Sequence, residues 1–335
     1  MGSEPFMSML RGLFLGLTIA CSLLAETPGP AHAETILTLG IVLGKNSHYG
    51  VAASVLADEV ARLTEGRFRV EIFPDGALGG EREMVVGTQL GTVDMVIVST
   101  GPVGNFVPAT LITDIPFLFR DYAHARFVLD GPIGQGILAE FPEHGLIALA
   151  WGENGFRHIT TSGTPVTSPR DLAGLKLRTM QNSVHMRAFK ALGVNPMPMP
   201  APNVYAALQS HVVDGQENPI PAILDLKLAE VQKYLSLTGH VYSPALTLMA
   251  PRLWKSLSDS DRALFGQAAR AAAAAMRATV NRQEKEGLES LRASGMTVID
   301  GIDKDGFQAA MAPAYAEYAH TFGQERIDSI RNARP

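Results

Sequence analysis

The sequence predicts an α/β protein built from two lobes, with mixed, mostly parallel sheets and a long helix that spans both lobes. Three observations carry this prediction. Strand-like and helix-like segments alternate through the first part of the chain, a turn-rich segment at 152–155 separates them from a second set of strands, and an alanine-rich helical segment extends from Asp261 to about Ala293. Strands that alternate with helices are typical of a parallel sheet covered by helices.

The chain begins with an expected export segment. Arg11 is followed by an apolar run at 12–25 and by a stretch with Pro and Gly that ends in Ala31-His32-Ala33. This is the layout of a signal peptide, and the run is shorter than the roughly 20 apolar residues that cross a bilayer. We therefore expect cleavage after Ala33, with residues 1–33 as the signal peptide. An uncleaved membrane anchor is the alternative.

Composition limits the classes of function. The formal charge is −5 without a run of Lys or Arg, so nucleic acid is not an expected partner. No segment after the first apolar run reaches transmembrane length, so a membrane role has to pass through a partner. The only cysteine, Cys21, lies within the expected signal peptide. A lipid-attachment role for Cys21 is a minor alternative, because Thr18 stands where a lipobox usually has Leu.

The first lobe is predicted from the order of its elements. Residues 36–43 alternate as a strand does, and apolar residues recur at helical spacing within 47–64. A strand at 68–73, a helix at about 81–90 and an apolar strand at 93–98 follow. Three further segments extend the lobe, and they lie at 115–119, 121–129 and 146–151.

The second lobe is expected to open near residue 156. The turn-rich segment 152–155 (GENG) precedes a strand at 156–161, the sequence SPRDL at 168–172 resembles a helix start, and 175–179 resembles a strand. Ser258 with Asp261 resembles a capping box for the long helix. Such a helix can brace both lobes, although an ordinary surface helix with a buried alanine stripe has the same pattern.

Motifs for catalysis are missing from the sequence. It has no G-x-S-x-G, G-x-x-x-x-G-K-[ST], H-E-x-x-H or G-x-G-x-x-G motif. None of the nine histidines pairs with another ligand at a spacing typical of a metal site, so no metal and no cofactor are expected. Asp259 and Asp261 are better explained as helix caps than as acid and base.

Arg178 is the first candidate for binding. It closes the strand at 175–178, where a charged side chain is expected to face a cleft. A guanidinium offers a planar fork of donors that fits a carboxylate with two hydrogen bonds. A surface ion pair is the more common role of a single arginine, and local sequence does not separate the two.

Several stretches taken together narrow the interpretation. They are ALGGEREM at 77–84, GTVDM at 91–95, GLKLR at 174–178, PMPM at 196–199, and VYAALQ at 204–209 running into VDGQENP at 213–219. With this spacing the chain resembles the solute-binding proteins of TRAP (tripartite ATP-independent periplasmic) transporters, the DctP family. The match covers nearly all of the chain after residue 33.

The resemblance implies a two-lobed periplasmic binding protein that closes on an organic acid and delivers it to membrane permease subunits, without catalysis and without a cofactor. The implied first lobe comprises residues 34–155 and about 244–285. The implied second lobe comprises 156–243 and about 286–335.

The resemblance also implies site residues. Arg178 resembles the arginine that grips the ligand carboxylate, Asn218 an asparagine that adds a side-chain hydrogen bond, and Arg157 a second cationic contact. The remaining positions match stretches that line the pocket, namely residues 46–49 with His48 and Tyr49, Glu81, Ser99, Thr100 and His240.

Some of these residues have simpler explanations. Glu81 is also explained as an acid in the first turn of a helix. His48 and Tyr49 are also explained as residues that cap and cover the first helix, and Asn218 before Pro219 as a turn residue.

The ligand and the wider class stay open at this point. The sialic-acid-binding branch has a phenylalanine where this chain has Ala201, so its ligand does not transfer. A dicarboxylate, a sugar acid or an aromatic acid is expected. The alternatives to a TRAP protein are a binding protein of an ABC importer, a receptor for a sensor kinase, and a periplasmic hydrolase or lyase that uses Glu81 with His48 or His240.

Overall fold

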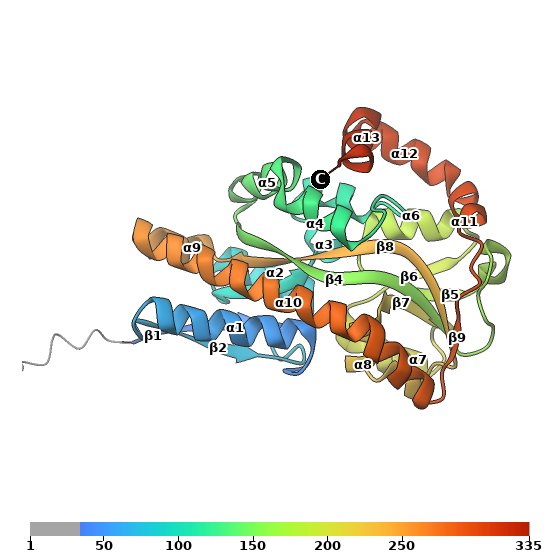
Figure 1. Ribbon diagram of the computed structural model, residues 1–335, viewed down its shortest axis with the longest axis horizontal. Helices are drawn as coiled ribbons and strands as arrows, with labels where there is room; N and C mark the ends of the chain where they lie inside the picture. The colour runs from blue at the N-terminus through green and yellow to red at the C-terminus, as the bar shows by residue number, and fades with distance from the viewer. Residues whose placement is uncertain (1–33, 335) are drawn as a thin grey trace, which may run out of the picture. The chain divides into compact units, whose positions relative to one another are not determined.

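A computed structural model describes residues 34–334 and shows the α/β architecture that the sequence predicts (Figure 1). Residues Glu34–Pro335 form one compact unit. The expected signal peptide lies outside the described residues. All nine strands of the described part join in one sheet in the order β2-β1-β3-β8-β4-β7-β5-β6, with β9 paired to β8. The strands are β1 (Thr35–Gly40), β2 (Phe68–Phe73), β3 (Met95–Ser99), β4 (Ile147–Thr161), β5 (Lys176–Thr179), β6 (Asn195–Pro198), β7 (Gly215–Pro219), β8 (Tyr234–Met249) and β9 (Thr297–Ile299).

Two parallel groups of strands flank a central antiparallel pair. Strand β1 is parallel to β2 and β3 on one side, and β5 is parallel to β6 and β7 on the other. The long strands β4 and β8 run antiparallel to each other, from Ile147 opposite Met249 to Thr161 opposite Tyr234. Because each long strand passes through both halves of the sheet, β4 and β8 connect the two lobes.

Helices cover the sheet, and their bounds follow the predicted alternation. In the first lobe they are α1 (His48–Leu63), α2 (Glu81–Leu90), α3 (Thr100–Val103), α4 (Tyr122–Asp130) and α5 (Pro132–Ala139), with 3-10 turns η1 (Pro108–Asp114) and η2 (Phe141–His144). In the second lobe they are α6 (Ser183–Ala191), α7 (Val204–Gln209) and α8 (Ile220–Asp225), with η3 (Pro169–Leu172), η4 (Ala201–Asn203) and η5 (Leu228–Glu230). The C-terminal part holds α9 (Pro251–Ser256), α10 (Asp259–Ala293), α11 (Lys304–Ala310), α12 (Ala312–Phe322) and α13 (Gln324–Asn332).

The long helix α10 contacts both lobes, as the sequence predicts. The Ser258 hydroxyl caps it by accepting a hydrogen bond from the Asp261 backbone N–H at 3.1 Å. The helix packs on α1 and on α8, which belong to different lobes (Figure 1). Its small side chains Ala268, Ala269 and Ala272 are fully buried, so they let the helix approach its neighbours closely.

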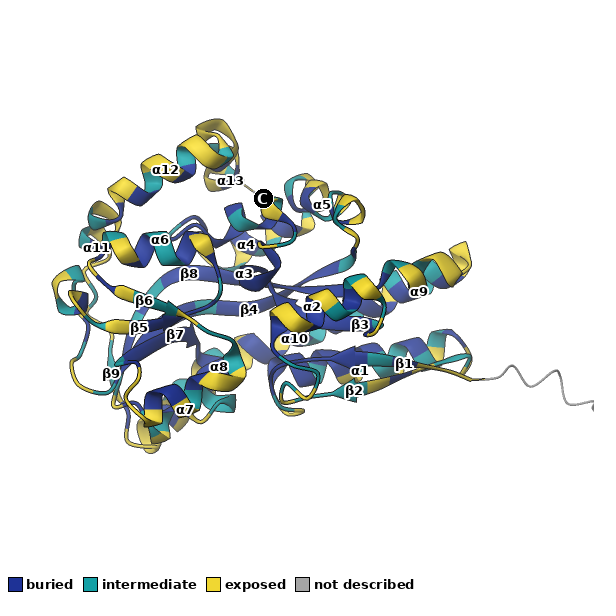
Figure 2. Ribbon diagram, turned by 180° about the vertical axis from the view of Figure 1, so that it is seen from behind, coloured by how far each residue is buried: buried dark blue, intermediate teal, exposed yellow. Residues whose placement is uncertain are grey.

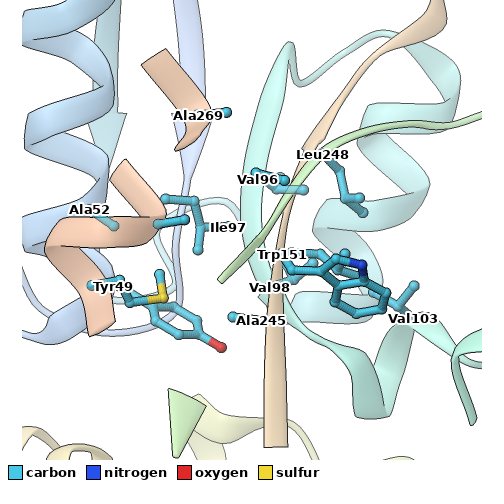
Figure 3. Packing of buried hydrophobic residues seen from close by; sticks show 14 of the residues in the cluster. Tyr49, Ala52, Val96, Ile97, Val98, Val103, Trp151, Ala245, Leu248 and Ala269 are labelled. Carbon is cyan, nitrogen blue, oxygen red and sulfur yellow. The ribbon is translucent and has the colours of Figure 1, made fainter. Parts of the chain in front are cut away.

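Three apolar clusters form the core, and the largest fills the first lobe. Figure 2 shows buried residues along the central strands, and Figure 3 shows part of the first cluster, with Trp151 beside Val98 and Leu248. Two smaller clusters fill the second lobe, one around Leu177 and Phe189 and one around Val204 and Ile223.

The C-terminal helices contact both lobes. The sequence assigns residues from about 286 onwards to the second lobe. Helix α11 does pack there, through Phe307 and Met311. Helix α12 lies against both lobes, because Tyr318 is buried in the first-lobe cluster while its hydroxyl donates to the carbonyl oxygen of Val184 on α6 at 2.7 Å. Helix α13 buries Ile330 in the first-lobe cluster.

Candidate ligand-binding cleft

A narrow cavity lies between the two lobes at the middle of the sheet. It is lined from the first lobe by Tyr49, Glu81 and Ser99, and from the second lobe by Arg178 and Asn218. About 320 Å³ of space without protein atoms, part of it open to solvent, lies among these residues. The two lobes touch across it, where the Ser99 hydroxyl lies 3.4 Å from the Sδ of Met180.

Arg178 is the cation of this cavity. It lies on β5 and is 3% exposed. Its Nε and Nη2 donate to the carbonyl oxygen of Met199 at 3.0 and 2.7 Å, and Nη1 has no hydrogen-bond partner in the described protein. Burial lowers the pKa of Arg178 to about 10, so the side chain is charged at neutral pH. The edge formed by Nη1 and Nη2 is therefore the one that can bind a carboxylate.

Arg157 is fully buried and already has a counterion. Its Nε and Nη2 donate to the carboxylate of Glu217 on β7, with Nη2 to Oε1 at 2.9 Å. Burial alone would raise the pKa of Glu217, but the charge of Arg157 and hydrogen bonds from His240 and Arg157 hold it well below its usual range. The charge of Arg157 is thus offset inside the protein. Arg157 does not line the cavity, but its Nη2 donates to the Oδ1 of Asn218, which does, at 3.1 Å.

Asn218 lines the cavity with an oriented amide. Besides the bond to Arg157, its Nδ2 donates to the Oε1 of Gln216 at 2.5 Å. Each amide nitrogen carries two N–H donors, so one donor remains for a ligand. Pairing on both sides fixes which way the amide points.

Glu81 is a carboxylate in the first-lobe wall. It is the first residue of α2, and its Oε1 accepts from the Ser99 backbone N–H at 2.6 Å and from the Ser99 hydroxyl at 2.9 Å. Burial raises the pKa of Glu81, and the bonds from Ser99 oppose that shift. The nearby Tyr49 hydroxyl is buried and has no hydrogen-bond partner among residues 34–334. A buried hydroxyl of this kind is expected to be satisfied by water or by a ligand.

Three of the predicted site residues lie behind the cavity wall instead of on it. His48 bonds through Nε2 to the Oδ1 of Asn154 at 2.8 Å, and Asn154 in turn lines the cavity. Burial lowers the pKa of His48 to about 4, so its ring is neutral at pH 7. Thr100 donates to the Oδ1 of Asp114 at 2.8 Å. Residue 46 of the matched stretch is exposed.

His240 is the third residue behind the wall. Its Nε2 lies 3.3 Å from the Oε2 of Glu217, and its Nδ1 lies 2.8 Å from the Thr238 hydroxyl. The ring packs edge-on against Phe189, with the centroids 5.4 Å apart. His240 therefore supports the Arg157–Glu217 pair instead of lining the pocket.

Sequence reasoning missed several residues that shape the cleft. Glu217 lies inside the quoted 213–219 stretch, but its partner Arg157 is 60 positions away in the sequence, and no local pattern connects them. For Asn154 the sequence predicts only a position in the turn-rich segment 152–155. The pair Asp114 and Asn182, which bond across the lobes at 2.8 Å, carries no sequence signal that we recognise.

The geometry does not support the hydrolase or lyase alternative. Among the described residues no hydrogen bond joins Glu81 to His48 or His240, because Ser99, Asn154 and Glu217 hold these three side chains. Within residues 34–334 there is also no group of three His, Cys, Asp or Glu side chains suited to a metal ion. No helix in that range is long and apolar enough to cross a bilayer.

Comparison with known proteins decides the family. The profile of the bacterial extracellular solute-binding proteins, family 7 (DctP), matches residues 39–321. The chain belongs to this family. The members are periplasmic proteins that bind substrates for transport and are not enzymes, so the predictions of a DctP protein and of a non-catalytic function are confirmed.

Relatives of known sequence or structure agree with this assignment. A solute-binding protein of Verminephrobacter eiseniae is 49% identical over 331 residues, covering 99% of this chain and 98% of the relative. The structure of a TRAP periplasmic solute-binding protein from Polaromonas bound to D-erythronate is 53% identical. It has a TM-score of 0.89 and covers 90% of this chain and 100% of that one. A second such structure, from Bordetella bronchiseptica with density assigned to pantoate, is 49% identical with a TM-score of 0.88 and covers the same shares of the two chains.

Proposed function

We propose that this DctP protein captures a small organic acid in the cleft and presents it to the membrane permease of a TRAP transporter. The observation that supports the proposal most is the meeting of Arg178, Asn218 and the unpartnered Tyr49 hydroxyl at one cavity shared by the two lobes. The relatives from Polaromonas and Bordetella, which hold erythronate and pantoate, support an acid as the ligand.

Capture is proposed to proceed by closure of the lobes. The carboxylate binds the free edge of Arg178, Asn218 donates its remaining N–H, and Glu81 and Tyr49 bind hydroxyl groups. Closing the cleft removes water and strengthens the ion pair. Affinity in the micromolar range corresponds to about −8 kcal/mol, which a buried ion pair, a few hydrogen bonds and some apolar contact can supply after the costs of closure.

Contacts between the lobes define what has to break when the cleft opens. Asn182 donates to the Oδ2 of Asp114 at 2.8 Å, and Asn105 donates to the carbonyl oxygen of Gln181 at 2.8 Å. At another point the Gly44 backbone N–H donates to the Oδ2 of Asp225 at 2.9 Å. These few hydrogen bonds are compatible with reversible closure, since each contributes only about 1 kcal/mol net.

The protein is proposed to be exported by its signal peptide and to bind the permease subunits of a TRAP transporter. Cleavage after Ala33 would release a mature protein that begins at Glu34, and N-terminal sequencing of periplasmic material checks this. Co-purification with TRAP permease subunits, and not with an ABC importer, is expected from cells that express both.

A thermal-shift screen of carboxylic acids tests the binding function. An acid at 100 times its dissociation constant should add about 2.7 kcal/mol to the free energy of unfolding. Mass spectrometry of the acid released on denaturation should return it unchanged. Turnover of the acid by the pure protein, or no stabilisation by any acid of the screen, would contradict the proposal.

A further inference from the structure

The cavity provides one cation for its ligand. Among the described residues, Arg178 and Glu81 are the only charged side chains that line it. Arg157 is paired with Glu217 and does not line it. A ligand with two carboxylates would therefore bury its second charge without a counterion, which is strongly unfavourable.

One end of the cleft also carries negative charge. Asp75 and Asp225 converge on Gly44, where a Cβ would lie 3.0 Å from the Oδ1 of Asp225 and 3.3 Å from the Oδ1 of Asp75. The partial burial of Asp225 raises its pKa, and the charge of Asp75 raises it further. Gly44 directly follows Leu43, which lines the cavity. A second carboxylate that extended toward this end would meet two acidic groups.

Apolar side chains form the wall at the same end. Val42 and Leu43 come from the first lobe, and Ala222 and Leu226 come from the second lobe. The buried Ala222 belongs to the same contact cluster as Val42 and Leu43, so the lobes meet here through apolar groups. A ligand hydroxyl against this wall would lose its hydrogen bonds to water without replacement, whereas an aliphatic group would gain from burial.

The closed lobes limit the size of the ligand. The Ser99 hydroxyl contacts the Sδ of Met180 across the cleft at 3.4 Å, and the Gly44–Asp225 hydrogen bond closes the other end. A longer acid would have to separate these contacts. A short chain fits the cleft without separating them.

We propose that the cleft selects a short monocarboxylic hydroxy acid with an aliphatic segment, and discriminates against dicarboxylates and six-carbon sugar acids. This inference rests on the proposed function. The carboxylate binds Arg178, the hydroxyl groups bind Glu81 and Tyr49, and the aliphatic segment contacts Val42, Leu43, Ala222 and Leu226.

Calorimetric titration with four acids tests the selectivity. Pantoate has a four-carbon chain with a hydroxyl next to its carboxylate and two methyl branches, and erythronate has the same chain with a hydroxyl in place of the methyl groups. Succinate has a second carboxylate, and galactonate has an unbranched chain of six carbons. Pantoate is expected to bind most tightly, and succinate and galactonate at least about tenfold more weakly. Equal or tighter binding of erythronate, succinate or galactonate would overturn the inference. If none of the four binds, the inference is overturned, and the proposed function fails as well only if no acid of the thermal-shift screen stabilises the protein.

A substitution in the apolar wall tests how much that wall contributes to the preference for pantoate over erythronate. Val42→Thr keeps the size of the side chain and places a hydroxyl in the wall. It is expected to reduce the ratio of pantoate to erythronate affinity by at least about threefold, because the new hydroxyl can pair with a ligand hydroxyl. The matched control Val212→Thr changes an exposed valine outside the cavity and should leave the ratio unchanged. An unchanged ratio in a folded Val42→Thr variant would contradict the assigned wall.

Discussion

At the scale of single residues, the cleft depends on how each polar group is already paired. Arg178 uses Nε and Nη2 on the carbonyl oxygen of Met199, which fixes the guanidinium in its plane and leaves the other edge for the ligand. Arg157 is neutralised by Glu217 and acts on the cavity through the Asn218 amide. Two arginines that look alike in the sequence therefore contribute differently, one to the ligand and one to the wall.

The first prediction concerns the shape of the Arg178 side chain. Arg178→Lys keeps the charge but cannot bond Met199 and a carboxylate with the same planar fork. Calorimetric titration should show binding weakened by at least about tenfold, or about 1.4 kcal/mol. Arg178→Ala should bind more weakly still.

Arg170→Lys is the matched control, because Arg170 is an exposed arginine of the same lobe. Circular dichroism checks that all variants fold. Wild-type affinity in the Lys variant would show that the bidentate arrangement is wrong.

The sequence predicts the cavity lining better than the layer behind it. Five of the residues expected at the site line the cavity, namely Arg178, Asn218, Glu81, Tyr49 and Ser99. His48, Thr100 and His240 lie one layer further back. A matched stretch identifies a segment near the ligand, but which side chain of the segment turns inward depends on partners such as Asn154, Asp114 and Glu217, which are remote in the sequence.

At the scale of elements, strand β4 bends where it crosses between the lobes, and the bend is linked by hydrogen bonds to the carboxylate of Glu284 on α10. Strand β4 changes register between Glu153 and Gly155, and Gly155 has a φ of 119°. Nearby, the Tyr122 hydroxyl accepts from the Phe156 backbone N–H at 3.2 Å and donates to Glu284 of α10 at 2.8 Å. The bend is therefore bonded to the long helix.

Gly155→Ala tests the bend. The added Cβ would lie 3.2 Å from both the Pro219 Cβ and the Tyr122 hydroxyl, at a positive φ that L-residues rarely adopt. The free energy of unfolding in urea should fall by about 1–3 kcal/mol. The control Gly136→Ala lies in α5, where a Cβ meets no atom within 4 Å, and should leave stability unchanged or slightly raised. Equal effects of the two substitutions would contradict the strained geometry.

The buried Asp114 predicts a dependence on pH. Burial raises its pKa to about 7, and hydrogen bonds from Thr100 and Asn182 oppose that shift. The folded protein then holds a proton that the unfolded chain, with an ordinary pKa near 3.9, has released. The contribution of Asp114 to stability is therefore favourable at low pH and declines as the pH rises from about 4 to about 7.

Asp114→Asn removes this titration while keeping a polar side chain. Urea unfolding of both proteins across that pH range should show a difference in unfolding free energy that changes with pH, the wild type losing relative stability as the pH rises. A difference that stays constant with pH would contradict the raised pKa. Comparing two proteins cancels the contribution of other acids with a raised pKa, such as the half-buried Glu284.

At the scale of the whole molecule, the structure is one sheet whose two halves are joined by β4 and β8 and braced by α10. The alternation of strands and helices predicts this class because each parallel strand needs a covering helix. The placement of α12 against both lobes and of α13 on the first lobe could not be predicted. Their sequences show which face is apolar, but several surfaces of the molecule could cover that face.

A crystal structure of the protein saturated with erythronate would show directly how the cleft binds an acid. We expect the acid between the lobes, with its carboxylate on the Nη1 and Nη2 edge of Arg178 and within hydrogen-bond distance of the Asn218 amide. The Arg157–Glu217 pair should stay intact. A carboxylate bound away from Arg178, or an acid bound outside the cleft, would contradict the account.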